Sequence, residues 1–285
     1  MKLVRPIITA ASLALLVGLS FGCAGFYGSH DTRRQSSTVE FLYPKGKDLK
    51  QRPTIPHMTL PISVGIAFVP ESEERRRRGY SIAEADKRDL LEQVAAQFRE
   101  LPYVSRIEII PSAYLQPGGG FRNLDQISAM HDVDVIALTA FDQAQHSDEG
   151  LLSITYLTVV GAYVMPGEKN DTSTMLDTAV YHVPSRKLLF RAPGTSRVKG
   201  RSTLINADAE RRKDSAEGFA VANEEMTANL KMELDRFKLR LKQEPEQYVI
   251  DHKPGYKGGG ATGPAMAALL TGALAVAQWR RKRKV

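Results

Sequence analysis

Six histidines and one cysteine are the side chains of this chain best suited to act as nucleophiles, bases or metal ligands. None of the histidines forms an HExxH or HxH pair, and neither a GxSxG elbow nor a dinucleotide-binding fingerprint is present. His146 lies near Asp142 and Asp148, but a polar loop after a strand explains this cluster as well as a metal site does. The sequence therefore predicts no catalytic residue, no metal and no cofactor. The alternative is an enzyme whose carboxylates are brought together only by the fold.

The single cysteine, Cys23, follows a segment with the layout of a signal peptide. Lys2 and Arg5 precede an uncharged run over residues 7–21, and small residues follow. At about 1.5 Å per residue this run makes roughly 22 Å of helix, which is too short to span a membrane and indicates a cleaved export signal. A lone cysteine also excludes an internal disulfide framework and a zinc site built on several cysteines.

Residues 19–24, LSFGCA, resemble a bacterial lipobox in which the leucine stands one place further from the cysteine than usual. The resemblance implies that signal peptidase II cuts between Gly22 and Cys23, and that Cys23 receives diacylglycerol and an amide-linked acyl chain. Three acyl chains exceed the two signals that stable anchoring requires. Ala24 differs from the aspartate that retains lipoproteins in the inner membrane, which favours the outer membrane. The alternative is a free or buried cysteine beside an ordinary cleavage site.

The C-terminal segment begins with Gly258, Gly259 and Gly260, continues as an apolar run to Trp279, and ends in five basic residues. The uncharged stretch of 22 residues makes about 33 Å of helix, enough to cross a membrane. The basic residues would keep the extreme C-terminus in the cytoplasm. A permanent tail anchor and an apolar core helix with a basic end are the alternatives.

This ordered tail resembles the GlyGly-CTERM sorting signal, which is processed by rhombosortase, a rhomboid-type intramembrane serine protease. Together with the lipobox it resembles the rhombotarget lipoprotein family. The resemblance implies a cut among Gly258, Gly259, Gly260 and Ala261, after which only the lipid on Cys23 holds the protein. Glycine disfavours helix by about 1 kcal/mol per residue relative to alanine, which suits a protease that must unwind its substrate.

The net charge of +7 arises entirely from the two ends of the chain. Residues 1–22 and 258–285 hold seven basic residues and no acidic ones, so the remaining residues are balanced. The middle of the chain therefore gives no electrostatic argument for binding nucleic acid.

The first half of the middle region alternates between strand and helix patterns. Strands are predicted at Ile62–Phe68, Val104–Ile110 and Val133–Phe141 from their β-branched and apolar residues. Possible capping boxes, Ser81 with Glu84 and Asn123 with Gln126, predict the starts of two helices between them. The second of these helices is expected to turn Leu124, Ile127 and Met130 inward.

The second half favours antiparallel strands and one long helix. Residues 151–164, 174–183 and 187–191 are rich in strand-forming residues. Apolar residues then recur at steps of three and four over residues 207–242, which predicts a helix that packs on the sheet or, alternatively, forms a coiled-coil dimer. The fold class is therefore α/β (α+β), with a β-α-β-α-β start extended by antiparallel strands.

These patterns divide the chain into five regions. They are a signal peptide (1–22), a proline-rich tether (23–60) in which 39–43 could form an edge strand, one α/β domain (61–245), a linker (246–257) and the sorting tail (258–285). The expected function is that of an exported lipoprotein of the cell envelope, a non-catalytic binding or structural module. Its expected partners are the lipoprotein acylation enzymes, rhombosortase, membrane lipid and an unidentified envelope protein or polymer. An envelope hydrolase is the alternative.

Overall fold

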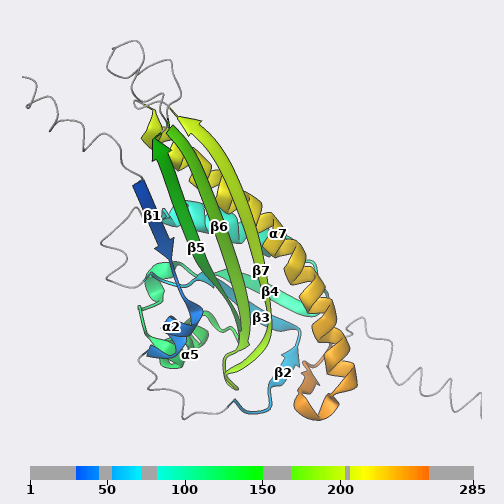
Figure 1. Cartoon of the computed structure of the whole chain (residues 1–285). Helices are drawn as coiled ribbons and strands as arrows, with labels where there is room; N and C mark the ends of the chain where they lie inside the picture. The colour runs from blue at the N-terminus through cyan, green and yellow to red at the C-terminus, as the bar shows by residue number, and fades with distance from the viewer. Residues whose placement is uncertain (1–29, 45–52, 72–81, 150–167, 203–205, 257–285) are drawn as a thin grey trace, which may run out of the picture.

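The computed structural model of the chain describes residues 30–44, 53–71, 82–149, 168–202 and 206–256 (Figure 1). The signal peptide, Cys23, the whole sorting tail and the predicted strand at 151–164 lie outside these residues. Among the described helices, none is both long and apolar enough to cross a membrane.

Strands and helices alternate along the first half of the described chain, and long antiparallel strands follow in the second half. The strands are β1 (His30–Gln35), β2 (His57–Leu60), β3 (Ile62–Phe68), β4 (Val104–Ile109), β5 (Val135–Glu149), β6 (Glu168–His182), β7 (Lys187–Ser202) and β8 (Val249–His252). The helices are α2 (Thr38–Leu42), α4 (Glu84–Ala96), α5 (Gly120–His131) and α7 (Ala207–Gln243), with short 3-10 turns η2 (Ser112–Tyr114) and η4 (Pro245–Gln247).

One mixed sheet forms the centre of the fold, with the strand order β4-β3-β5-β6-β7. β3 pairs in parallel with both β4 and β5, as expected when α4 and α5 connect successive strands. β5, β6 and β7 then pair antiparallel over long registers. The prediction of an α/β sheet extended by antiparallel strands and covered by a long C-terminal helix is confirmed.

The sheet carries a hydrophobic cluster on each face. On one face the cluster joins the sheet to α4 and α7, and Phe219, Met226 and Phe237 of α7 lie in it. On the other face α2 and α5 cover the part of the sheet around Ile136 and Leu138. The apolar stripe of α7 is therefore buried against its own sheet, as the first of the two sequence interpretations proposed.

The predicted tether and linker both contribute strands to the domain, which corrects the boundaries 61–245. β1 pairs antiparallel with β5 along the half that β3 does not reach. Its sequence is polar throughout, and its pairing partner rather than its own pattern makes it a strand. β2 and β8, from the predicted tether and linker, pair in parallel as a separate two-stranded sheet. The possible edge strand at 39–43 is instead part of α2, whose N-cap Ser37 accepts a hydrogen bond from the amide of Glu40.

The two helices do not begin where the predicted capping boxes place them, and Ser81 of the first box lies outside the described residues. α4 begins at Glu84 with Ala83 as its N-cap, and the Glu84 carboxylate instead accepts hydrogen bonds from the backbone amide and hydroxyl of Ser112. α5 begins earlier than predicted, at Gly120, which places Asn123 inside the helix. Both polar side chains bond to residues in or just after η2: Glu84 bonds Ser112, and Asn123 bonds Tyr114 and Gln116.

Candidate functional site

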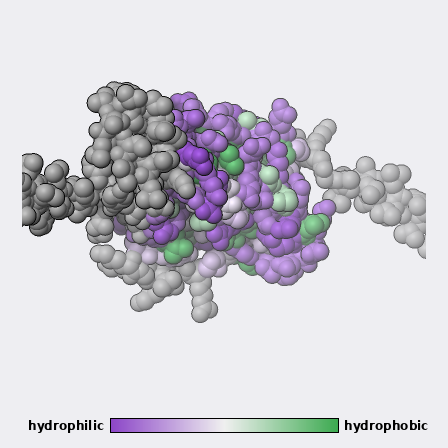
Figure 2. Space-filling view, turned by 45° about the horizontal axis from the view of Figure 1, so that its top comes forward, coloured by the Kyte–Doolittle hydropathy of each residue, from purple (hydrophilic) through white to green (hydrophobic). Residues whose placement is uncertain are grey.

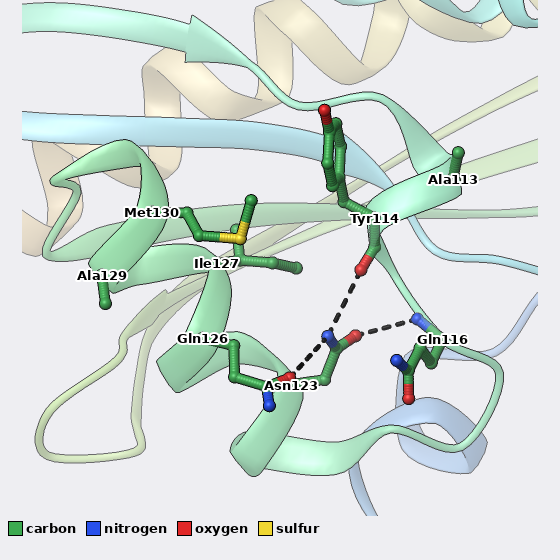
Figure 3. Close-up of a pocket in the computed structure, with 8 residues that line it drawn as sticks. All are labelled: Ala113, Tyr114, Gln116, Asn123, Gln126, Ile127, Ala129 and Met130. Carbon is green, nitrogen blue, oxygen red and sulfur yellow. Dashed lines mark hydrogen bonds between the residues drawn. The ribbon is translucent and has the colours of Figure 1, made fainter.

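A groove lies between α5 and η2 and has a volume of about 560 Å³ (Figure 3). We call it the α5–η2 groove. Its lining consists of aromatic, aliphatic, thioether and amide side chains: Ala113, Tyr114, Gln116, Asn123, Gln126, Ile127, Ala129 and Met130. Tyr114 and Met130 are 48% and 64% exposed, so large apolar groups line a groove that is open to solvent.

Asn123 fixes the shape of this groove. Its side chain is buried, its Oδ1 accepts a hydrogen bond from the amide of Gln116 at 2.8 Å, and its Nδ2 donates to the carbonyl of Tyr114 at 3.3 Å. Because the Asn123 side chain pairs with the last carbonyl of η2 and with an amide just after it, it holds this segment against α5. The position of Tyr114 at the groove therefore depends on Asn123.

The prediction that Leu124, Ile127 and Met130 all point inward is wrong for Met130. Leu124 and Ile127 are buried, but Met130 is exposed. At about 100° per residue a step of three falls short of a full turn, so Met130 is rotated by about 120° from Leu124 around the helix. This drift moves the thioether from the core to the groove.

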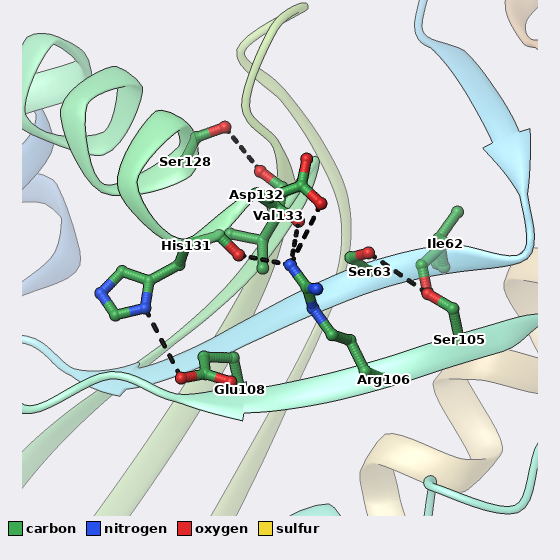
Figure 4. Close-up of polar contacts among 9 residues, drawn as sticks. All are labelled: Ile62, Ser63, Ser105, Arg106, Glu108, Ser128, His131, Asp132 and Val133. Carbon is green, nitrogen blue, oxygen red and sulfur yellow. Dashed lines mark hydrogen bonds and ion pairs between the residues drawn. The ribbon is translucent and has the colours of Figure 1, made fainter.

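Polar contacts tie the C-terminal end of α5 to strand β4 beside the groove (Figure 4). The Arg106 guanidinium donates to the carbonyls of His131 and Asp132 at 2.6 and 2.7 Å, which satisfies carbonyl groups at the helix end. His131 Nδ1 lies 3.6 Å from a carboxylate oxygen of Glu108, and its ring makes an edge contact with Tyr114. His131 Nε2 is buried without a hydrogen-bond partner. These contacts fix the C-terminal end of α5 next to Tyr114, which lines the groove.

A second groove, of about 490 Å³, lies between the start of α2 and the neighbouring strands β5, β6 and β7. Ion pairs between neighbouring strands contribute to its lining, which includes Asp142, Asp177 and Arg191. Arg33 binds Asp142 with an N–O distance of 2.5 Å, and Arg191 binds Asp177 at 2.6 Å. In the view of Figure 2 most of the described surface is hydrophilic, and hydrophobic residues are scattered over it. We call the face of the sheet that carries the ion pairs Arg33–Asp142, Arg191–Asp177 and Arg197–Asp171 the open sheet face.

Carboxylates on the open sheet face are charge partners of arginine. Arg197 hydrogen-bonds Asp171 and holds the pKa of that carboxyl below its usual range. A general acid needs the opposite shift, towards neutral pH. This face therefore suits electrostatic recognition better than proton transfer.

Of the cluster that invited a metal interpretation, the structure describes the side chains of Asp142 and His146. Asp142 is bound by Arg33, and His146 is an exposed residue of β5 whose Cα partner on β6 is Asp171. Over the described ranges, no three His, Cys, Asp or Glu side chains come together as a metal site. The predicted residues Gly22, Cys23, Gly258, Gly259, Gly260 and Ala261 all lie outside the described residues.

One serine–histidine pair invites comparison with a nucleophilic site. His182 Nδ1 lies 2.8 Å from Ser185 Oγ in the turn between β6 and β7. The two residues are only 2% and 4% exposed, and neither lines a groove described above. Burial lowers the pKa of His182. The pair therefore closes the turn between the two strands.

Sequence reasoning missed Tyr114 and Asn123 as groove residues. Tyr114 stands in a short segment without periodicity, and the spacing of Asn123 to Gln126 resembles a helix start. The one usable signal was the two successive steps of three, from Leu124 to Ile127 and on to Met130, which together rotate Met130 off the buried face.

No protein family and no curated protein matches this chain. Three solved structures match this chain, each with a low sequence identity and a low TM-score. A neuraminyllactose-binding hemagglutinin homolog from Helicobacter pylori is 13% identical with a TM-score of 0.36, over 67% of this chain and 94% of that one. The PelC dodecamer protein from Paraburkholderia phytofirmans is 12% identical with a TM-score of 0.29, over 70% and 96%. The protein CT253 from Chlamydia trachomatis is 8% identical with a TM-score of 0.24, over 63% and 95%. At these values the function has to be argued from the chain's own residues.

Proposed function

We propose that this chain is an exported bacterial envelope lipoprotein whose α/β domain is a non-catalytic binding module. The observation that carries the binding role is the α5–η2 groove. Its volume of about 560 Å³ lies within the range of about 300–1,000 Å³ that is usual for ligand sites. Its lining offers apolar contact from Tyr114 and Met130 and amide hydrogen bonds from Gln116 and Gln126, without any carboxylate or histidine.

This lining suits a segment of an envelope protein or polymer better than a reacting substrate. Tyrosine and methionine are enriched where proteins meet, because a tyrosine ring combines an apolar body with a polar end and a thioether adapts its shape. The exposed amides can pair with a backbone or a polymer hydroxyl. A catalytic groove would instead present convergent titratable groups.

The export and anchoring part of the proposal rests on the sequence. The lipobox-like segment places diacylglycerol on Cys23, and the glycine-rich tail is cut by a rhombosortase-type protease near Gly258–Ala261. The protein is then held in the outer membrane or at the cell surface by its lipid alone.

The binding role is tested by site-specific photo-crosslinking in the bacterium that makes the protein. A photoreactive amino acid replaces Met130 in the groove or, as a control, Glu246, an exposed residue in η4. We expect a discrete crosslinked product from position 130 alone, and its loss when Tyr114→Ala is added. Equal products from both positions, or a product that survives Tyr114→Ala, would contradict a binding role for this groove.

The anchor is tested separately by growing cells with labelled palmitate. The wild-type protein is expected to take up label and the Cys23→Ser variant none. Label in the variant, or an unlabelled wild-type protein, would overturn the anchor without affecting the groove.

A further inference from the structure

β7 is the last strand of the main sheet, so one side of its backbone has no neighbouring strand. Over the first half of β7, side chains of α7 bind this side. Asn229 donates to the Pro193 carbonyl at 2.7 Å, and the Thr195 amide donates to the Glu225 carboxylate at 2.6 Å. Pro193 itself has no N–H that needs a partner. An edge that is capped in this way does not pair with a further strand.

α7 leaves the edge of β7 further along the strand. In Figure 1 the helix crosses the sheet obliquely. Near the start of the helix, the Gln145 side chain of β5 donates to the Arg211 carbonyl at 2.8 Å, and the Gln143 side chain donates to the Ser215 carbonyl at 3.1 Å. The N-terminal half of α7 therefore covers the face of the sheet and not the edge of β7.

The backbone groups of Arg197, Lys199 and Arg201 point to the same side of β7 as those of Thr195. Alternate residues of a strand share one direction, and the β6–β7 register has no shift over residues 190–202. Within the described part of the chain, no group binds these outward N–H and C=O groups. We call Arg197–Arg201 the free β7 edge. A row of unpaired backbone groups is a template for strand pairing.

The free β7 edge is positively charged on the open sheet face. Arg197, Lys199 and Arg201 are all exposed. Arg197 hydrogen-bonds Asp171 at 2.9 Å, whereas Lys199 and Arg201 form no ion pair with a residue that the structure describes. Two cations at the edge are therefore available to a partner.

The other side of the same edge is acidic. A Cβ atom on Gly200 would collide with the carboxylate of Asp214, so this carboxylate lies directly against the strand. Glu210 and Glu217 of α7 are close enough to repel the charge of Asp214. A strand added to this edge thus meets positive charge on one of its faces and negative charge on the other.

We propose that the free β7 edge binds an extended acidic segment of a partner protein as an added strand. Acidic residues at alternate positions of that segment face Lys199 and Arg201, and neutral residues between them face α7. A second copy of this chain does not fit. Antiparallel pairing of the edge with itself sets Arg197 opposite Arg201, and like charges directly opposite are destabilising. This site is separate from the α5–η2 groove and goes beyond the role proposed for it.

Binding is measured by fluorescence anisotropy, with the full-length protein purified in detergent and short fluorescein-labelled peptides. One peptide alternates glutamate with threonine, and the other has lysine in place of glutamate. We expect the glutamate peptide alone to bind. Equal binding of both peptides, binding of the lysine peptide alone, or no binding of either would overturn the proposal.

Two substitutions of Lys199 separate strand pairing from attraction between charges. Lys199→Ala keeps the backbone N–H and should weaken binding of the glutamate peptide by about threefold, as for one exposed charge pair. Lys199→Pro also removes the N–H that faces the partner and should weaken binding by about a further tenfold. Pro193 shows that the strand accepts proline at an edge-facing position. Equal binding by the two variants would show a contact without strand pairing and would overturn the proposal.

Charge reversal gives a check that does not depend on proline. The double variant Lys199→Glu, Arg201→Glu should lose the glutamate peptide and bind the lysine peptide. The control Lys253→Glu, at an exposed position just after β8, should behave like the wild type. An unchanged preference in the double variant would mean that the peptide binds elsewhere. Analytical ultracentrifugation without peptide should show no dimer that Lys199→Pro dissociates, since such a dimer would assign the edge to a second copy and overturn the proposal.

Discussion

Gly194 of β7 lies so close to Ala222 of α7 that a Cβ atom on Gly194 would come within 2.2 Å of the Ala222 carbonyl oxygen. The same Cβ would lie 2.4 Å from the backbone nitrogen of Met226. Because both neighbours are backbone atoms of a long helix, neither can move without displacing the helix. This contact sets how closely α7 approaches the sheet, and with it the packing of Phe219 and Met226 in the core.

Gly194→Ala should therefore destabilise the protein strongly. Overpacking a core usually raises the free energy of the folded state by about 1–3 kcal/mol, and the backbone position of this contact favours the upper end. Urea unfolding of the purified protein measures the change. Ser173→Ala, on the exposed side of the sheet, is the matched control and should leave the midpoint unchanged. A Gly194→Ala midpoint equal to wild type would contradict the close approach.

Asn123→Ala should loosen the loop at the α5–η2 groove. The substitution leaves the amide of Gln116 and the carbonyl of Tyr114 without their partner, and a buried group left unpaired costs about 1–3 kcal/mol. Gln126→Ala, an exposed change on the same helix, is the control. Hydrogen exchange at the Gln116 amide should become faster in Asn123→Ala and stay slow in the control. Slow exchange in both variants would show that another group holds the loop.

Periodicity predicted those elements whose own residues decide their structure. β3, β4, the buried part of β5 and α7 carry apolar residues at strand or helix spacing. β1 could not be predicted, because its residues are all polar and become a strand only by pairing with β5. There Arg34 donates to the Gln143 side chain at 3.0 Å and to the Ser215 hydroxyl at 3.2 Å, partners far away in the sequence.

The groove escaped prediction for a related reason. The spacing of Asn123 to Gln126 also occurs at helix starts. Only the hydrogen bond from the Gln116 amide shows that Asn123 holds the segment that lines the groove. A recognition surface is not local, since its residues come from separate elements.

Asp214 makes the stability of the domain depend on pH. Burial, followed by repulsion from Glu210, raises the pKa of this carboxyl, and its Oδ2 has no hydrogen-bond partner. Since the folded pKa lies above the unfolded one, the folded state gains from the protonated carboxyl at low pH. That gain is lost as the pH rises through the folded pKa.

Asp214→Asn should consequently stabilise the protein at pH 7 by about 1 kcal/mol, the lower end for a buried unpaired polar group, because the amide carries no charge. Near pH 3, where both wild-type states hold the proton, the two proteins should unfold at similar urea concentrations. Glu210→Gln, which removes the neighbouring charge, should shift stability in the same direction and by less. Equal stability at pH 7 would contradict a raised pKa for Asp214.

Intact and peptide mass spectrometry of the mature protein tests the central claim most directly, because one sample reports both processed ends. The account predicts an N-terminal Cys23 carrying diacylglycerol and an amide-linked acyl chain, and a C-terminus among Gly258, Gly259, Gly260 and Ala261. A mature chain that keeps its basic C-terminal residues and an unmodified Cys23 would contradict it.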